Sequence, residues 1–200
     1  TSRENGQHWI ALHTLNNVVD KKPGFFIFDS FGKVGLKQFF IQDDAPTLNK
    51  CITNLEESME SLKKDRENKF DFFHWNIDCE QYEIMPKKEK NSLSKTTRGL
   101  FTLIKSYLKH HNQYFNAKET KIDMYGLADR LQNFDRTTCG IFCLYYTFYL
   151  YNPHPVFNMI DTEGDLNTVK KLINSIFVDV SEKDFNDINF ELITEFAKAN

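Results

Sequence analysis

Cysteine is scarce in this 200-residue chain, and its four copies stand at the irregular positions 51, 79, 139 and 143. A chain of this size can build a core without disulfides, so the four thiols favour a reducing compartment. A zinc site would need close cysteine or histidine pairs in two places. Cys139 and Cys143 supply only one such pair. We therefore expect no metal and no other cofactor.

Long apolar runs and strong charge are also missing. No run of eighteen apolar residues occurs, so we predict no membrane-spanning segment. The net charge of −3 argues against nucleic-acid binding as the main function, and the lysine-rich stretches 86–98 and 105–121 fit solvated surfaces better than a DNA site. Neither an internal repeat nor a linker divides the chain. We predict a single α+β domain, residues 1–200, in which a small sheet is flanked by helices.

Hydrophobic periodicity gives the expected elements. The stretches 8–15 and 24–30 are rich in aromatic and branched residues and are separated by turn signals, which predicts an antiparallel hairpin. Residues 120–130 form a further expected strand. The polar stretch 86–97 is expected to be a mobile loop. Apolar residues at helical spacing predict helices over residues 47–69, 97–111 and 165–177, over 181–199, and from Cys139 to the Asn152-Pro153 pair.

Glycine is rare as well, with eight copies, yet one directly follows a cysteine at the start of the apolar stretch TTCGIFCLYYTFYL. A threonine at 137 or 138 can cap a helix here, which places Cys139 at a helix N-terminus, where unpaired amides and the dipole favour an anion. Because the thiolate is the nucleophilic form of cysteine, this position suits a catalytic thiol. The alternative is a small core residue, which is what we expect of Cys143 one turn later.

A nucleophilic cysteine needs a histidine base that is held by a carboxylate or an amide. His8 stands at the entry of the first expected strand, and Asp29 lies near the end of its hairpin partner. The start of one antiparallel strand faces the end of the next, so local structure alone brings these two side chains together. A strand-end histidine and a turn aspartate without catalytic roles are the simpler interpretation. Gln132, seven residues before Cys139, can donate a hydrogen bond to an oxyanion beside the backbone N–H of the nucleophile.

Three blocks, GQHWIAL, FFIFDSFG and LQNFDRTTCGIFCLYY, together resemble the adenovirus maturation protease family (adenain) and its relatives. The relatives include the SUMO-deconjugating proteases and the proteases of Polinton-type elements, virophages and other large DNA viruses. The shared order is a His-Trp pair, an acid after a hydrophobic strand, a glutamine, and a Cys-Gly pair that opens a central helix. The seven-residue step from Gln132 to Cys139 and the DSFG stretch are closer to adenain than to the SUMO proteases.

The resemblance implies an α+β, papain-like cysteine protease fold of the adenain and SUMO-protease type. It makes Cys139 the nucleophile and His8 the general base, with Asp29 orienting His8. Gln132 and the Cys139 amide would form the oxyanion hole. The implied substrate-binding residues are Trp9 and Gly140.

Two stretches depart from the resembled pattern. Residues 33–120, between the acid and the glutamine, are longer than in adenain, and we interpret them as a lineage-specific insertion. The stretch FFHWNIDCE (72–80) contains a second His-Trp pair and a cysteine. We interpret it as a decoy, because no glycine follows Cys79 and no glutamine precedes it at a suitable distance.

The implied activity is that of a viral maturation cysteine endopeptidase, which cuts capsid and core precursor polyproteins at small Gly or Ala residues through a Cys-His-Asp triad. We expect a monomer that acts in the virion and in the cytoplasmic virus factory or the nucleus of the infected cell. Adenain uses DNA and an activating peptide, but the charge of this chain does not support DNA as a partner. Two alternatives stay open: an isopeptidase that removes SUMO or another ubiquitin-like modifier, and a non-catalytic binding domain of the same fold.

Overall fold

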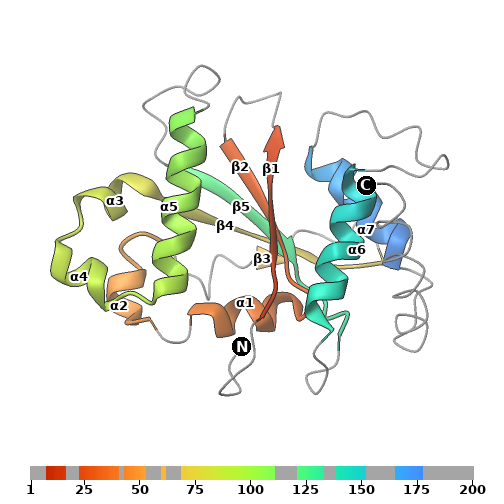
Figure 1. Ribbon diagram of the computed structural model, residues 1–200, viewed down its shortest axis with the longest axis horizontal. Helices are drawn as coiled ribbons and strands as arrows, with labels where there is room; N and C mark the ends of the chain where they lie inside the picture. The colour runs from red at the N-terminus through yellow and green to blue at the C-terminus, as the bar shows by residue number, and fades with distance from the viewer. Residues whose placement is uncertain are drawn as a thin grey trace.

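The computed structural model describes residues 8–16, 23–40, 43–52, 60–61, 69–110, 121–132, 138–151 and 165–177. Within these ranges a five-stranded sheet runs through the centre of the molecule, with helices on both faces (Figure 1). From one edge to the other, the strands are β1 (Ala11–Asn16), β2 (Pro23–Phe28), β5 (Lys121–Leu127), β4 (Phe72–Asp78) and β3 (Glu60–Ser61).

The sheet is mixed. Strands β1 and β2 pair antiparallel, with Ala11 opposite Phe28, which confirms the predicted hairpin. Strand β2 runs parallel to β5, with Gly24 opposite Asp123. Strand β4 runs antiparallel to β5 and carries β3 on its other side. The α+β class and the strand expected within residues 120–130 are therefore confirmed.

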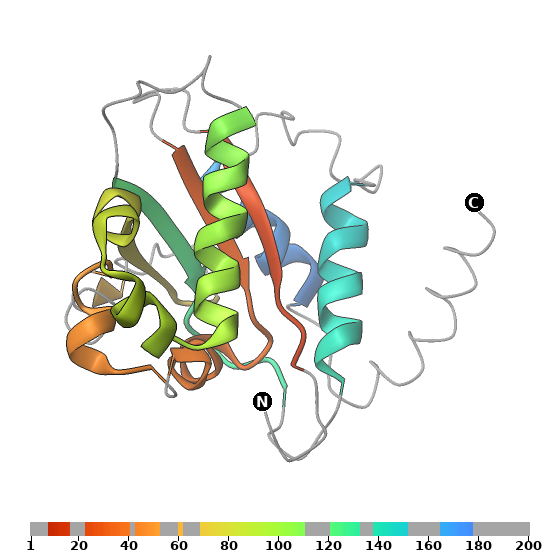
Figure 2. The same cartoon turned by 60° about the vertical axis from the view of Figure 1, so that its left-hand side comes forward.

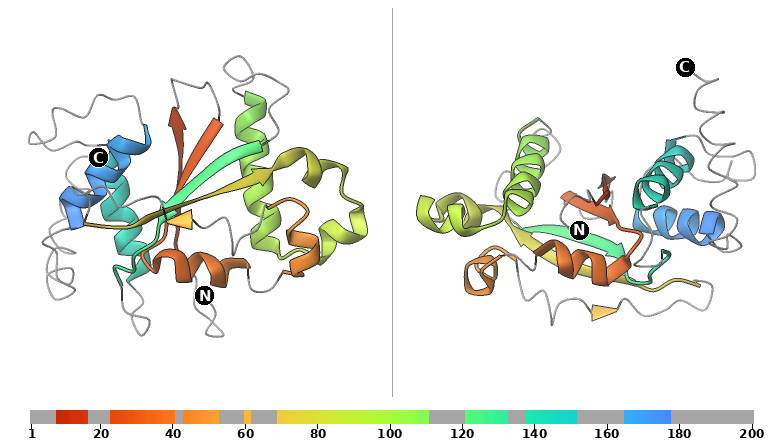
Figure 3. Two further views of the ribbon diagram at one scale, coloured as in Figure 1. Left: turned by 180° about the vertical axis from the view of Figure 1, so that it is seen from behind. Right: turned by 60° about the horizontal axis from the view of Figure 1, so that its bottom comes forward.

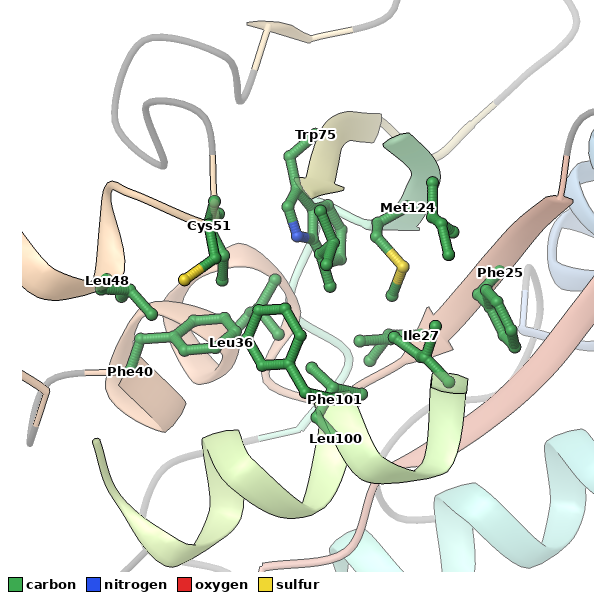
Figure 4. Packing of buried hydrophobic residues seen from close by; sticks show 14 of the residues in the cluster. Phe25, Ile27, Leu36, Phe40, Leu48, Cys51, Trp75, Leu100, Phe101 and Met124 are labelled. Atoms are coloured by element: carbon green, nitrogen blue, oxygen red, sulfur yellow. The ribbon is translucent and has the colours of Figure 1, made fainter. Parts of the chain in front are cut away.

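Alternate residues of each strand point to opposite faces, so the sheet separates two cores. On one face Ile27 of β2 packs with Trp75 of β4 and Met124 of β5 (Figure 4). Helix α5 covers this face with Leu100, Phe101 and Ile104, whose spacing places them on one side of the helix. Figure 3 shows the shorter helices gathered beside α5 and along one end of the sheet. The helices on this side are α1 (Gly32–Phe40), α2 (Ala45–Leu48), α3 (Cys79–Ile84), α4 (Lys87–Ser92) and α5 (Lys95–His110).

Helices α6 (Cys139–Tyr151) and α7 (Leu166–Phe177) cover the opposite face. They pack on Phe26 and Phe28 of β2, and the Phe28 ring stacks on Tyr146 of α6 with centroids 4.4 Å apart. Figure 2 shows β1 and β2 between α5 and α6. The helices predicted over 97–111, over 165–177 and from Cys139 are confirmed, and α6 ends directly before the Asn152-Pro153 pair. The helix predicted over 181–199 lies outside the described residues.

The predicted helix over residues 47–69 is wrong where the structure describes the chain; residues 53–59 and 62–68 lie outside the described ranges. The chain forms the four-residue α2, then a turn, a bridge from Ile52 to Ile77, and strand β3. The Asp44 carboxylate caps α2 by accepting the N–H of Thr47 at 3.3 Å. Leu48, Cys51 and Ile52 still face the core, so the apolar spacing was a true signal of burial. Pairing with β4 at Ile52 and at β3 takes the place of the helical hydrogen bonds expected there.

The predicted loop over residues 86–97 is also wrong, because it contains α4 and the start of α5. Pro86 precedes α4, where its fixed φ suits a helix start, and the following lysines and glutamate are good helix formers. The Nζ of Lys50 pairs with Oε2 of Glu89 at 2.7 Å, and Nζ of Lys90 donates to the carbonyl of Glu83 at 2.7 Å. These contacts hold α4 against neighbouring elements.

Residues 33–120 contribute strands β3 and β4, helices α2 to α5, and all of α1 except its first residue. Since β4 pairs with β5 from Phe72 to Asp78, this stretch builds part of the sheet and most of one core. Its interpretation as an insertion relative to adenain stays a prediction.

Candidate active site

The candidate site lies at the end of the sheet where strands β2 and β5 finish. Because β2 and β5 are parallel, their carboxyl ends lie at the same end of the sheet, and the antiparallel β1 begins there. Asp29 directly follows β2, Gln132 lies beyond the end of β5, and His8 precedes β1. Helix α6, whose first residue is Cys139, begins at this same end of the molecule (Figure 1). Topology therefore brings four distant parts of the chain to one place.

His8 and Asp29 form a buried hydrogen-bonded pair. Nε2 of His8 lies 2.9 Å from Oδ2 of Asp29, and the two side chains are 5% and 4% exposed. The other carboxylate oxygen accepts the N–H of Phe31 at 2.8 Å. The Phe31 ring stacks on the imidazole, with centroids 5.0 Å apart and planes 22° apart. The pairing expected from the hairpin is present, and the orientation of the ring is fixed from two sides.

The second nitrogen of His8 is the more informative one. Within the described residues, Nδ1 is buried and has no hydrogen-bond partner. A buried polar nitrogen without a partner costs free energy, so a group left in this condition is a candidate for exchange of protons with a reactant. Since Asp29 engages Nε2, Nδ1 is the nitrogen that can act as a base.

Cys139 begins α6, at the end of the helix where the dipole favours negative charge. The carbonyl of Thr138 accepts the N–H groups of Ile141 and Phe142, which closes the first turn. The threonine at 137, the other cap candidate, lies outside the described residues. The thiol of Cys139 is buried, with 5% of the residue exposed.

Trp9 joins the histidine segment to α6. A Cβ on Gly140 would lie 3.3 Å from Cδ1 of Trp9, so the indole rests directly on the glycine. The thiol of Cys143 donates to the carbonyl of Trp9 at 3.3 Å. The residue after His8 thus contacts the residue after Cys139. Because consecutive Cα atoms are only about 3.8 Å apart, His8 and Cys139 each lie one residue away from this contact. The segments that carry the candidate base and the candidate nucleophile are packed together.

Gln132 is almost completely buried beside the same loop, with 1% of the residue exposed. Its side-chain oxygen accepts the Oγ–H of Ser30 at 2.6 Å, and its backbone N–H donates to the carbonyl of Ser30 at 3.2 Å. Ser30 follows Asp29 in the chain, so the candidate oxyanion donor and the candidate orienting acid are held by one turn.

Sequence reasoning missed three contributors: Ser30, Phe31 and Gly35. A Cβ on Gly35 would lie 2.5 Å from Oδ2 of Asp29, so the carboxylate occupies the space that a side chain would fill. Ser30 and Phe31 stand inside the DSFG stretch but have no signal of their own. A glycine inside a helix is unfavourable, and Gly35 in α1 is a detectable signal for that reason.

The remaining described histidines lie elsewhere. His13 in β1 accepts from or donates to the hydroxyl of Tyr146 at 3.1 Å through Nδ1, and burial lowers the pKa of His13 to about 4. His74 in β4 pairs with Asp123 in β5 at 2.8 Å, within the paired strands and not in the loops that follow them. His110 ends α5. The histidines at 111 and 154 are outside the described residues.

Comparison with known proteins adds no relative: no protein-family model matches the chain, and no curated protein or solved structure matches it either. Among the described residues, no group of three or more histidine, cysteine or acidic side chains is placed to hold a metal ion. None of the helices in the described ranges has the length and apolar character needed to cross a membrane.

Proposed function

We propose that this protein is a cysteine endopeptidase with a papain-like fold of the adenain and SUMO-protease type. The observation that carries the proposal is the buried His8–Asp29 pair, whose imidazole keeps an Nδ1 without a partner among the described residues. The next residue, Trp9, packs on Gly140 in the first turn of α6. Acyl transfer requires a base, an acid that orients it, a nucleophilic thiol and an oxyanion donor. This end of the sheet supplies His8, Asp29, the helix-terminal Cys139 and the buried amide of Gln132.

Peptide cleavage begins at the Cys139 sulfur. His8 takes the thiol proton, and the resulting thiolate attacks the carbonyl carbon of the scissile bond. A carbon–sulfur bond forms as the carbonyl oxygen becomes an oxyanion. The side-chain amide of Gln132 and the backbone N–H of Cys139 donate hydrogen bonds to that oxygen. Asp29 keeps the imidazole in the required tautomer and stabilises the imidazolium.

The second half of the reaction releases the products. The protonated His8 gives its proton to the leaving amine as the carbon–nitrogen bond breaks, which leaves a thioester on Cys139. Water then attacks the thioester while His8 accepts a proton. The carbon–sulfur bond then breaks and the carboxylic acid leaves. The proton on His8 returns to the Cys139 sulfur, which restores the starting state.

Small residues flank the scissile bond in the substrates we propose. The Trp9 indole is 57% exposed and rests on Gly140, so a bulky substrate side chain beside the sulfur would collide with it. The position of this indole supports substrates with Gly or Ala on both sides of the scissile bond. Capsid and core precursor polyproteins of a virus are the proposed substrates. The protein would then work as a monomer in the virion and in the virus factory or the nucleus, with no cofactor.

The test is a cleavage profile on a peptide library, with the wild type and two cysteine variants. Cys139→Ala is expected to abolish turnover, whereas Cys79→Ala, at another helix-opening cysteine, is expected to keep it. The preferred peptides should carry Gly or Ala at the cut. A Cys139→Ala variant that still cleaves at the wild-type rate, or a wild type that cleaves nothing, contradicts the proposal.

A second substrate arm separates peptide-bond cleavage from modifier removal. A short Gly-containing peptide and a fluorogenic ubiquitin-like modifier C-terminus are compared at equal concentration. We expect faster turnover of the peptide. Preference for the modifier by a large factor would replace the endopeptidase with a deconjugating isopeptidase of the same chemistry.

A further inference from the structure

Ser30 connects two parts of the site that sequence reasoning treats separately. It is completely buried, and its hydroxyl donates to Oε1 of Gln132 over 2.6 Å. Its carbonyl accepts the backbone N–H groups of Leu131 at 2.8 Å and Gln132 at 3.2 Å. One residue thus holds both the main chain and the side chain of the glutamine.

The direction of the Ser30 hydrogen bond matters for chemistry. A glutamine amide has an acceptor end and a donor end, and only the donor end can stabilise an oxyanion. The final torsion of a glutamine side chain is broad, so the two ends can exchange by rotation. A hydroxyl proton on Oε1 fixes that end of the amide and leaves Nε2 on the opposite side. Without this proton, a rotated amide would turn its oxygen toward the developing negative charge.

The turn that carries Ser30 is itself held tightly. Gly32, with φ of +62°, allows the chain to reverse, and its N–H donates to the carbonyl of Asp29 at 2.9 Å. A Cβ on Gly32 would collide with the carbonyl oxygen of Asp129, so the turn lies directly against the loop after β5. The N–H of Lys33 donates to the carbonyl of Ala128 at 3.1 Å. Ser30 therefore reaches Gln132 from a fixed position.

We propose that Ser30 is the positioning residue of the oxyanion hole, which acts on the reaction only through the orientation of the Gln132 amide. This inference rests on the proposed protease function. It assigns to Ser30 an effect on the transition state and none on the nucleophile.

The test is a double-mutant cycle of Ser30→Ala and Gln132→Ala with the best peptide from the cleavage profile. Gln132→Ala should lower kcat about a hundredfold, since it removes an oxyanion donor. Ser30→Ala should lower kcat about tenfold, with KM changed less than about twofold. In the Gln132→Ala background, Ser30→Ala should have no further effect on kcat, because the amide through which it acts is gone.

A chemical readout separates positioning from general damage. Alkylation of Cys139 by iodoacetamide displaces iodide without forming an oxyanion, so Ser30→Ala should leave its rate unchanged. Ser175→Ala, which removes an exposed hydroxyl bonded to the carbonyl of Lys171 at 2.9 Å, is the matched control and should change neither rate. If Ser30→Ala does not fold, Ser30→Cys replaces it, because a thiol fills similar space but donates weakly.

Three results would overturn the inference. The first is a wild-type kcat in Ser30→Ala or its substitute. The second is a loss of kcat from Ser30→Ala that is as large in the Gln132→Ala background as in the wild type, and the third is an alkylation rate that falls together with kcat in Ser30→Ala. In all three the wild type still cleaves through Cys139, and the proposed function stands. A wild type without Cys139-dependent cleavage would remove the proposed function, and this inference with it.

Discussion

Two regions of this protein carry the same residue types in different surroundings. Each has a His-Trp pair, a carboxylate bonded to the histidine, and a cysteine that begins a helix. The first set is His8, Trp9, Asp29 and Cys139, and the second is His74, Trp75, Asp123 and Cys79. The two sets differ in where the fold places them and in what surrounds them.

The histidine pairs differ in their place on the sheet. His8 lies before the start of β1 and Asp29 directly after the end of β2, and their side chains are 5% and 4% exposed. His74 and Asp123 lie within β4 and β5 as a cross-strand pair, and their side chains are 30% and 23% exposed. Cys79 is five residues beyond His74, which along an extended strand corresponds to about 16 Å. A base at that distance cannot take a proton from the thiol.

The cysteines differ in what precedes them. Asp78 caps α3 by accepting the N–H of Gln81 at 3.0 Å, so a carboxylate already occupies the anion-favouring end of that helix. Burial, and after it the charge of Asp78, raise the pKa of Cys79 to about 12. The neutral Thr138 precedes Cys139. The same helix-terminal position therefore suits a thiolate in α6 and disfavours one in α3.

The largest expected difference is between the two carboxylates. Asp29→Asn should lower kcat/KM about a thousandfold or more, because an amide cannot hold the imidazole of His8 in the tautomer that general-base catalysis needs. Asp123→Asn is the matched control. It should leave kcat/KM unchanged and cost about 1 kcal/mol or less of stability, as partly exposed ion pairs do. Steady-state kinetics and chemical denaturation of both variants measure this, and equal activities would end the distinction.

The thiols should differ by a smaller factor, on the order of a hundredfold in alkylation rate at pH 7. The pKa of Cys79 is raised to about 12, so its thiolate is rare at pH 7 and increases as the pH rises toward that value. Cys139 is less exposed than Cys79, so exposure alone favours Cys79. We expect mass spectrometry of iodoacetamide-treated protein to find Cys139 modified first at pH 7 and Cys79 to gain between pH 8 and 10. Labelling of Cys79 first at pH 7 would contradict the assignment of the reactive thiol.

Part of this fold and site is predictable from sequence because local rules determine it. The hairpin follows from two apolar stretches with turn residues between them, and the His8–Asp29 contact follows from the hairpin. Helices α5, α6 and α7 follow from periodicity and from the Asn152-Pro153 stop. Each of these signals lies within a short stretch of chain.

The failures have non-local causes. Residues near Ile52 satisfy a helical pattern, but the bridge to Ile77 provides hydrogen bonds that only the folded sheet makes available. The helix after Pro86 depends in part on Lys50, which is 39 residues away from its partner Glu89. The bond from Ser30 to Gln132 joins residues 102 positions apart. Residues whose role depends on a distant loop carry no local pattern, so sequence reasoning could not identify them.

The smallest expected change in activity concerns Gly35, whose missing side chain leaves space for the Asp29 carboxylate. Gly35→Ala would place a methyl group 2.5 Å from Oδ2 of Asp29, so the carboxylate must leave the position in which it bonds His8. We expect kcat/KM to fall about tenfold, even though alanine favours a helix by about 1 kcal/mol over glycine. Gly99→Ala in α5 is the matched control, because apart from its chain neighbours and the backbone of α5 itself no atom lies within 4 Å of its Cβ position.

Gly99→Ala should raise the free energy of unfolding by up to about 1 kcal/mol and leave kcat/KM unchanged, since only the helix preference acts there. For Gly35→Ala the clash opposes that preference, so its stability should fall below that of Gly99→Ala. Thermal unfolding and steady-state kinetics on both variants measure the two effects separately. Wild-type activity in a folded Gly35→Ala protein would mean that the position of the Asp29 carboxylate does not control His8. The fixed carboxylate would then give the buried pair no catalytic advantage over the partly exposed pair of His74 and Asp123.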